Sequence, residues 1–291
     1  MTLNNRPLAL VTGASSGIGF ELARQFLSNG FDTVMVADGE DIRSAARSLQ
    51  GLGGEPIPLQ IDLADRHGAS TLQSAINSLR KPLEAAAINA GIGTGGPFIE
   101  TDLAQELRII DLNVASTVSI AKWVARDMAA RNEGRILFTS SIIARTPAPF
   151  QAIYGASKAF VQSFSQALRN ELKDTGVSVS TLLPGPTETP FFEKADLLDT
   201  RVGAEEKDDA AQVAEQGFKG LMKGEGNILG GSLKSRTLGL GSNVLPDAAG
   251  AAFGRRLSEP GSANEPGSAG QPGSASEPEP RPDSGEDKEA N

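Results

Sequence analysis

The chain lacks cysteine altogether and has only one histidine, one tyrosine and one tryptophan among its 291 residues. Without cysteine there is no disulfide, no thiolate nucleophile and no metal site built from thiolates. The single histidine, His67, lies in a polar stretch typical of a loop or a first helical turn, so we expect it to be an exposed side chain. A serine triad and a histidine-built zinc site both need a histidine placed as a base or a ligand, and His67 is not expected to be one. We therefore expect neither chemistry and no metal site.

Long apolar runs are missing as well. No stretch approaches the ~20 apolar residues that a membrane-crossing helix needs, and the first residues do not form the apolar core of a signal peptide. We therefore expect a cytoplasmic protein with no membrane span. Positive charge is also scarce, because 27 basic residues stand against 36 acidic ones. Nucleic-acid binding usually needs a basic face, so we expect no nucleic-acid partner.

Residues 258–291 contain no leucine, isoleucine, valine or aromatic side chain, and they carry eight acidic and two basic residues. A six-residue unit, Glu-Pro-Gly-Ser-Ala-Asn in its first copy, occurs three times between Glu259 and Ser276. A segment of this composition cannot bury enough apolar surface to offset the entropy of ordering it. We predict a disordered tail at 258–291. Before it, an extension at 233–257 either packs on the body or is mobile.

Residues 1–232 alternate short apolar runs with helical patterns, which is typical of βαβ units and a parallel sheet. Several of the apolar runs are nearly continuous, as expected of strands that helices cover on both faces. The sequence therefore predicts one α/β domain, a doubly wound, Rossmann-like parallel sheet of about seven strands flanked by helices. The predicted strands are residues 8–12, 33–37, 56–61, 85–89, 135–140, 177–183 and 227–230, and the predicted helices are residues 17–29, 42–49, 66–79, 101–131, 154–173 and 208–223.

A glycine-rich segment follows the first predicted strand and opens the first predicted helix: Thr12-Gly13-Ala14-Ser15-Ser16-Gly17-Ile18-Gly19. This arrangement presents backbone N–H groups and the positive end of a helix dipole to a pyrophosphate. Gly13 allows a tight turn, Gly17 a close approach to phosphate, and Gly19 close packing of helix on strand. The alternative is a glycine-rich turn with no ligand. The candidate dinucleotide contacts in this turn are Gly13, Ser15, Ser16, Gly17, Ile18 and Gly19.

Asp38 ends the second predicted strand, nineteen residues after Gly19. An acid at this place accepts hydrogen bonds from the adenosine ribose hydroxyls of a dinucleotide. Its carboxylate also repels the 2′-phosphate of NADP, and no arginine or lysine follows before Arg43. NAD is therefore favoured over NADP. A helix N-cap is the alternative role for Asp38.

The next two predicted strands also end in candidate cofactor contacts. Asp62, followed by Leu63, ends the third strand, where its side chain can reach the adenine amino group or simply cap the next helix. Asn89-Ala90-Gly91 ends the fourth strand, and its small residues let the backbone lie along the adenosine ribose.

Tyr154, the only tyrosine, precedes Lys158 by four residues on a predicted helix, and Ser141 lies thirteen residues before Tyr154. The spacing places the ammonium near the phenol. A free phenol titrates near 10, and we expect the ammonium and a positively charged nicotinamide ring to lower the pKa of Tyr154 toward the working range together. Tyr154 then exchanges a proton with a substrate oxygen that Ser141 orients, although Ser140 competes for that role. With the glycine turn, this constellation indicates a hydride-transfer enzyme.

The order and spacing of these motifs resemble the short-chain dehydrogenase/reductase family over about residues 7–230. The matching residues are the glycine turn, Asn89-Ala90-Gly91, Asn113, Ser141, Tyr154 with Lys158, and Pro184-Gly185. One departure is Ile88, where the family usually has asparagine. The resemblance implies NAD(P)-dependent interconversion of a secondary alcohol and a ketone or aldehyde by a homodimer or homotetramer. It also implies that Lys158 binds the nicotinamide ribose, and that Asn113 kinks a long helix and holds a water connecting Lys158 to solvent.

Pro184-Gly185-Pro186-Thr187 follows the sixth predicted strand at the ligand-binding edge of such sheets. Thr187, or Thr189 as a second candidate, bonds the nicotinamide carboxamide. The stretch 190–198 is amphipathic and suited to close over a substrate as a lid. The candidate apolar pocket walls are Ile143, Phe150, Phe191 and Phe192.

Two alternatives to this interpretation stay open. A catalytically idle NAD(H)-binding sensor or scaffold would keep the glycine turn but has no need of Ser141, Tyr154 or Lys158. A dehydratase or epimerase also uses tyrosine and lysine, usually with a longer substrate domain. For the substrate we expect an apolar or mid-sized alcohol or ketone, since the sequence shows no basic cluster near the lid that would call for a phosphorylated or CoA substrate.

Overall fold

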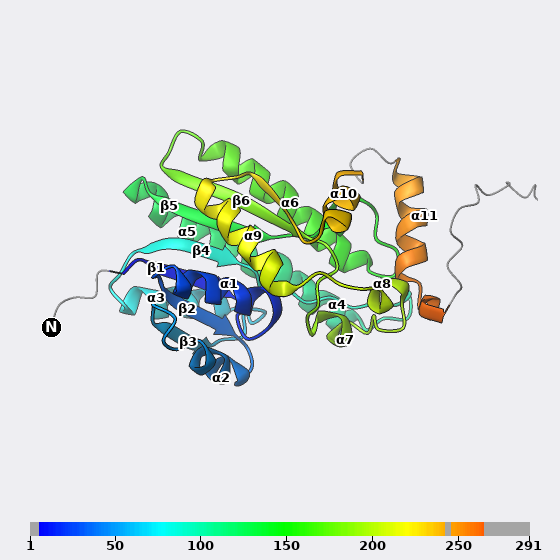
Figure 1. Ribbon diagram of the computed structural model, residues 1–291, viewed down its shortest axis with the longest axis horizontal. Coiled ribbons are helices and arrows are strands. Elements are labelled where there is room, and N and C mark those ends of the chain that lie inside the picture. Colours follow the sequence, from blue (N-terminus) through cyan, green and yellow to red (C-terminus); the bar gives the residue numbers. More distant parts are fainter. Residues whose placement is uncertain (1–5, 242–245, 265–291) are drawn as a thin grey trace, which may run out of the picture.

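A computed structural model of the chain describes residues 6–241 and 246–264, which form a central sheet with helices on both faces (Figure 1). Within these residues the sheet has seven parallel strands in the order β3-β2-β1-β4-β5-β6-β7. The order reverses between β1 and β4, at the switch point where doubly wound sheets bind ligands. The predicted fold class is confirmed. The strands are β1 (Leu8–Thr12), β2 (Asp32–Ala37), β3 (Pro56–Gln60), β4 (Leu83–Ile88), β5 (Gly134–Thr139), β6 (Val177–Pro184) and β7 (Asn227–Gly230).

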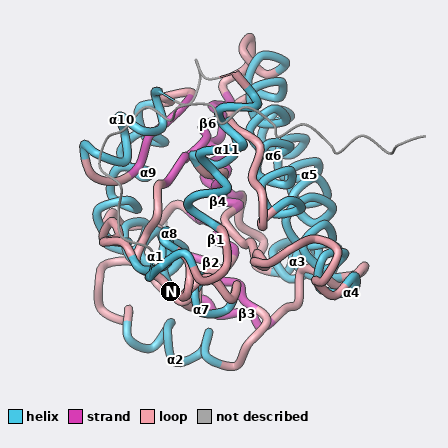
Figure 2. Tube along the Cα trace, turned by 90° about the vertical axis from the view of Figure 1, so that its right-hand side faces the viewer, coloured by secondary structure: helices cyan, strands magenta, loops and turns pink. Residues whose placement is uncertain are grey.

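The two faces of the sheet bury separate apolar clusters, because side chains alternate along each strand. In β1, Ala9 and Val11 join one cluster, and Leu8 and Leu10 join the other. The strands lie between the two resulting helix layers in Figure 2. Helices α1 (Gly17–Ser28), α2 (Asp41–Ser48) and α9 (Ala210–Lys223) cover the Ala9 face, and α3 (Gly68–Ser78), α5 (Thr117–Arg131) and α6 (Ala152–Glu171) cover the Leu8 face.

The helix predicted at 101–131 is divided. It consists of α4 (Leu103–Ile110), a π-helical segment (Asp111–Ser116) and α5. Asp102 caps α4 by accepting a hydrogen bond from the Ala104 N–H, which explains why the helix begins two residues later than predicted. Apolar periodicity does not distinguish one π-helical turn from α-helix, so the hydrophobic pattern could not reveal the division. The family resemblance implied a kink at Asn113, which lies inside this π-helical segment. The other predicted elements agree with the observed ones to within two residues at each end.

Four α-helices of the described residues were not predicted. They are α7 (Phe191–Lys194), α8 (Arg201–Ala204), α10 (Leu233–Gly241) and α11 (Asp247–Ser258). The last two account for most of the 233–257 extension. Helix α11 packs against the segment before α6, where Gly250 lies against Thr146 and Gly254 against Pro147. None of the described helices is both long enough and apolar enough to cross a membrane.

The start of the predicted tail is ordered, which corrects the boundary at 258. The Gln151 side-chain amide donates a hydrogen bond to the buried Ser258 hydroxyl at 2.8 Å. Beyond it, the Ala263 N–H donates to the carbonyl of Asp199, and a 3₁₀ turn spans Ser262–Asn264. Hydrogen bonds rather than apolar burial attach this segment, so its lack of apolar residues misled the prediction. Residues 265–291 lie outside the described part of the chain.

Candidate active site

A cavity of about 1300 Å³ lies at the carboxyl edge of the sheet, where the segments after β1 through β6 meet. It runs from Asp38 and Asp62, past the start of α1 and the loops after β4 and β6, to helix α11. Ser141, Tyr154 and Lys158 line it, as do all the other predicted cofactor contacts: Gly13, Ser15, Ser16, Gly17, Ile18, Gly19, Asp38, Asp62, Leu63, Asn89, Ala90, Gly91, Pro184, Gly185, Thr187 and Thr189.

The glycine turn is tied to the end of β4. The Thr12 hydroxyl accepts hydrogen bonds from the backbone N–H groups of Asn89 and Ala90, both at 3.0 Å. Gly13 and Gly17 have φ angles of +67° and +55°, a region that favours glycine. Helix α1 begins at Gly17, and its N-cap Ser16 makes no side-chain capping bond. The first N–H groups of α1 therefore remain available for an anion.

The space around this turn fits a dinucleotide. A Cβ atom on Gly17 would lie 2.7 Å from the Thr189 methyl carbon, so only glycine lets the start of α1 approach the loop after β6. A Cβ atom on Gly91 would lie 3.0 Å from the Lys158 ammonium, so glycine also keeps the approach to Lys158 open. A helix N-terminus without a side-chain cap, two glycine-dependent approaches and strand-end carboxylates together match the phosphates and ribose hydroxyls of such a ligand.

At one end of the cavity an arginine from α4 joins the two predicted carboxylates. Arg108 Nη2 lies 3.0 Å from Asp62 Oδ2 and 3.6 Å from Asp38 Oδ2. The second oxygen of Asp62 accepts a hydrogen bond from the Ala64 N–H, so Asp62 caps a local turn and α3 begins only at Gly68. The N-cap of α2 is Glu40, so Asp38 does not serve as that cap.

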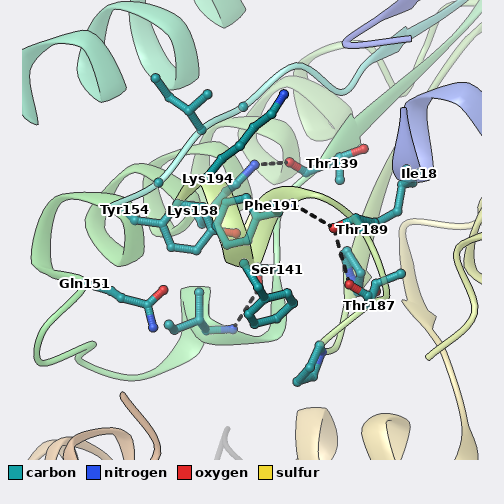
Figure 3. Close-up of a pocket in the computed structure, with 18 of the residues that line it drawn as sticks. Ile18, Thr139, Ser141, Gln151, Tyr154, Lys158, Thr187, Thr189, Phe191 and Lys194 are labelled. Carbon is teal, nitrogen blue, oxygen red and sulfur yellow. Dashed lines mark hydrogen bonds between the residues drawn. The ribbon is translucent and has the colours of Figure 1, made fainter. Parts of the chain in front are cut away.

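Ser141, Tyr154 and Lys158 meet in the middle of the cavity (Figure 3). The Ser141 hydroxyl accepts a hydrogen bond from the Ile143 N–H at 3.3 Å, and its interaction with the Tyr154 phenol favours a lower pKa of that phenol. The competing Ser140 hydroxyl is engaged elsewhere, since it donates to the backbone carbonyl of Lys158 at 2.7 Å. Tyr154 and Lys158 lie one turn apart on α6, with the ammonium 5.8 Å from the centre of the phenol ring.

Burial dominates the acid–base properties of this pair. It raises the pKa of Tyr154 to about 12, although the Ser141 hydrogen bond acts in the opposite direction. It lowers the pKa of Lys158 to about 8, because the ammonium is removed from water. In the protein alone the pKa of Tyr154 is therefore raised, and the lowering expected from Lys158 together with a bound nicotinamide ring stays a prediction. The rise occurs because desolvation penalises phenolate more than the hydrogen bond favours it.

Asn113 lies in the π-helical segment and is buried, and it is not among the residues that line the cavity. Its side-chain oxygen accepts a hydrogen bond from the Ile92 N–H at 3.0 Å. Its side-chain nitrogen donates to the Ile92 carbonyl and to the Ser157 hydroxyl, both at 2.9 Å. Asn113 thus joins the loop after β4 to α6, next to Lys158.

The loop after β6 brings apolar side chains to the pocket. The ring of Phe191 lies 5.0 Å from that of Tyr154, centre to centre. Phe192 lines the cavity but is buried in a small apolar cluster. Phe150 differs from the expectation, because it is not among the lining residues and its ring lies against the Arg255 guanidinium. Thr187 donates its hydroxyl hydrogen to the Gly185 carbonyl, and Thr189 donates to the Thr187 carbonyl.

Several lining residues were missed by sequence reasoning. Arg108 is one of them, and α11 contributes Phe253 and Leu257 to the outer cavity. Basic side chains line this part too, which differs from the expected absence of a basic cluster: Lys194, Arg201, Lys234 and Arg256. They come from four separate helices, α7, α8, α10 and α11, so no short sequence pattern indicates that they lie in one cavity. Among the described residues, no group of three or more acidic or histidine side chains is arranged to hold a metal ion.

Comparison with known proteins agrees with this geometry. The family model for short chain dehydrogenase matches residues 7–197, about two thirds of the chain. The chain belongs to the short-chain dehydrogenase/reductase family. A short chain dehydrogenase of Pseudocercospora fijiensis is 30% identical over 195 residues, which cover 66% of this chain and 63% of that protein. The matched part thus spans less than two thirds of that relative's length.

Solved structures of family members share the fold. A short-chain dehydrogenase from Sphingobium yanoikuyae in complex with NADPH is 28% identical, with a TM-score of 0.71 over 77% of this chain and 87% of that one. A bulky-bulky ketone specific alcohol dehydrogenase from Comamonas testosteroni is also 28% identical, with a TM-score of 0.68 over 77% and 86% of the two chains. The family agrees with the one that the sequence motifs resemble.

Proposed function

We propose that this short-chain dehydrogenase/reductase is an NAD(P)-dependent enzyme that interconverts a secondary alcohol and a ketone. The observation that carries the proposal is that Ser141, Tyr154 and Lys158 line the same cavity that begins at the glycine turn, with Lys158 one helical turn from Tyr154. A protein that only senses a dinucleotide has no need of these three side chains together in such a cavity.

The residues have distinct roles in this proposal. A bound nicotinamide would supply or accept the hydride at the carbonyl carbon. Tyr154, protonated at neutral pH because its pKa is about 12, gives its proton to the carbonyl oxygen as negative charge develops there. The Ser141 hydroxyl donates a hydrogen bond to the same oxygen. The protonated phenol suits the reductive direction, and a positive charge beside it would lower its pKa for oxidation.

The residues that line the cavity support a set of cofactor contacts. Gly13 to Gly19 would hold the pyrophosphate, Lys158 the nicotinamide ribose, and Thr187 or Thr189 the carboxamide. Asp38 supports NAD as the preferred cofactor, because its carboxylate accepts hydrogen bonds from the ribose hydroxyls and repels a 2′-phosphate. NADP is the less favoured cofactor.

We infer an apolar or mid-sized ketone or alcohol as substrate. Ile143, Phe191, Phe253 and Leu257 provide apolar walls along the outer cavity. The similarity to a bulky-bulky ketone specific alcohol dehydrogenase supports a ketone with substituents on both sides of the carbonyl. The basic side chains from α7, α8, α10 and α11 would further favour a substrate whose distal end is polar or negatively charged.

A homodimer or homotetramer is part of the proposal. Exposed apolar side chains on α4 support it, because Leu103, Leu107 and Ile110 recur at helical spacing and share one face. Light scattering of the full chain will give the assembly. The cytoplasmic location and the absence of a nucleic-acid partner stay predictions from the sequence.

The decisive experiment follows nicotinamide absorbance with NADH and NADPH over a panel of ketones and alcohols. Tyr154→Phe should abolish turnover and leave NADH binding nearly intact, and Ser141→Ala should lower kcat by at least about tenfold, a conservative figure for one transition-state hydrogen bond. Ser163→Ala, an exposed serine on α6, is the matched control and should retain full activity. A Tyr154→Phe variant with most of its activity would refute Tyr154 as the proton donor. Tight NADH binding without turnover on any compound would instead favour the sensor or scaffold.

A further inference from the structure

We propose that Arg108 forms a binding subsite for the 2′-phosphate of NADPH and thereby limits the preference for NADH that Asp38 creates. The inference rests on the proposed function, because it concerns the adenosine end of the same cavity. It concerns a residue that the sequence did not point to, since Arg108 lies 46 positions from Asp62 and on a different type of element.

Arg108 lies next to the two strand-end carboxylates at the adenosine end of the cavity. It lines the cavity from α4, opposite the ends of β2 and β3. One guanidinium nitrogen lies within 3.6 Å of a carboxylate oxygen of Asp38 and within 3.0 Å of one of Asp62. A group that binds to Asp38 at the adenosine ribose therefore lies within reach of this guanidinium.

The positive charge of Arg108 offsets the negative charge of Asp38. Asp38 alone would repel a 2′-phosphate, which has close to two negative charges. With Arg108 beside it, the local charge at Asp38 is partly neutralised, and the guanidinium offers planar N–H donors that match phosphate oxygens in pairs. The Asp38 carboxylate can then accept hydrogen bonds from the ribose hydroxyls of NADH, while the Arg108 guanidinium donates hydrogen bonds to the 2′-phosphate of NADPH.

All three side chains of this ion-pair cluster are exposed to water. The side chains of Arg108, Asp38 and Asp62 are 45%, 68% and 41% exposed. Ion pairs this open to water contribute only about 0–1 kcal/mol, so they do not hold the guanidinium against a stronger anion. A phosphate oxygen, with its higher charge, would displace the carboxylates as the partner of Arg108.

The test measures dissociation constants rather than turnover. The full chain is titrated with NADH, NADPH, 5′-AMP and adenosine 2′,5′-diphosphate, and the variant is Arg108→Gln. We expect the ratio of the NADPH to the NADH dissociation constant to rise about tenfold, the size of one charge-assisted phosphate contact. The diphosphate should weaken relative to 5′-AMP by the same factor. Arg43→Gln is the matched control, because Arg43 is exposed, lies five positions after Asp38 and is not among the lining residues.

The outcomes separate this inference from the proposed function. An unchanged ratio in Arg108→Gln, or an equal change in Arg43→Gln, overturns the phosphate subsite while cofactor binding as such stands. In an Asp38→Asn background the effect of Arg108→Gln should persist, because the contact is with phosphate. Its disappearance would mean that Arg108 acts only by restraining Asp38, which also overturns the subsite. A wild-type protein that binds none of the four nucleotides overturns the proposed function itself.

Discussion

The Lys158 ammonium donates a hydrogen bond to the Thr139 carbonyl, 3.0 Å away, at a place where only 5% of the residue is exposed. One neutral acceptor compensates poorly for the loss of water around a charge, so burial lowers the pKa of Lys158 to about 8. An unfolded lysine titrates near 10.4. Between these two values the unfolded chain binds more protons than the folded one, so the lysine makes stability rise with pH.

This difference predicts a pH-dependent stability. Wild-type protein should gain about 2 kcal/mol of unfolding free energy relative to Lys158→Met between pH 7 and pH 9.5, since one pKa unit corresponds to about 1.4 kcal/mol. Chemical denaturation at both pH values measures it. Lys122→Met, an exposed lysine of α5, is the control and should parallel the wild type. A gap between wild type and Lys158→Met that is the same at both pH values would contradict the buried-ammonium account.

Asn113→Ala should destabilise the protein and impair turnover together. The change leaves the Ile92 N–H and carbonyl without their side-chain partner, and a buried polar group left unpaired costs about 1–3 kcal/mol. We expect a loss of about 2–3 kcal/mol in unfolding free energy and a lower kcat, because the cofactor-facing loop after β4 loses its anchor to α6. Asn77→Ala, on the exposed side of α3, should change neither. Normal stability with lost activity would show a direct catalytic role instead.

Gly17→Ala should weaken nucleotide binding for a steric reason. The added Cβ would lie 2.7 Å from the Thr189 methyl carbon, and the φ of +55° adds strain. Gly30→Ala isolates the strain, because Gly30 has a φ of +84° and nothing within 4 Å of an added Cβ. Both variants should lose about 1–2 kcal/mol of stability, but only Gly17→Ala should raise the dissociation constant for NADH, by at least about tenfold. Equal NADH affinity in the two variants would mean that the cofactor does not bind at the start of α1.

Shortening the chain should have an effect that depends on the cut. Ending it after residue 264 should leave the melting temperature unchanged. Ending it after residue 257 removes Ser258, the partner of the Gln151 amide, and Ser262, whose hydroxyl accepts from the Arg201 N–H. Calorimetry should show a drop of several degrees for the shorter form, consistent with about 1–3 kcal/mol lost. Identical melting curves would mean that residues 258–264 do not stabilise the body.

The core of the fold and much of the candidate site could be predicted, because both rest on local geometry. Near-continuous apolar runs predict strands covered on both faces, and each such strand was found within two residues of its predicted ends. The i and i+4 spacing of Tyr154 and Lys158 determines their proximity on any helix. Local sequence patterns could not predict the π-helical turn at Asn113 or the anchored start of the predicted tail, since the hydrogen bonds at both places join groups far apart in the chain.

The sequence by itself determined the parallel sheet, the glycine turn at the start of α1 and the spacing of the candidate proton-transfer residues. Their spacing along the chain is short enough for local backbone geometry to decide. Only the tertiary structure decided that Arg108 lies beside Asp38, that α11 walls the outer cavity, and that the pKa of Tyr154 is raised rather than lowered. Proximity between residues far apart in the chain and exclusion of water are properties of the packed molecule, and no local pattern encodes them.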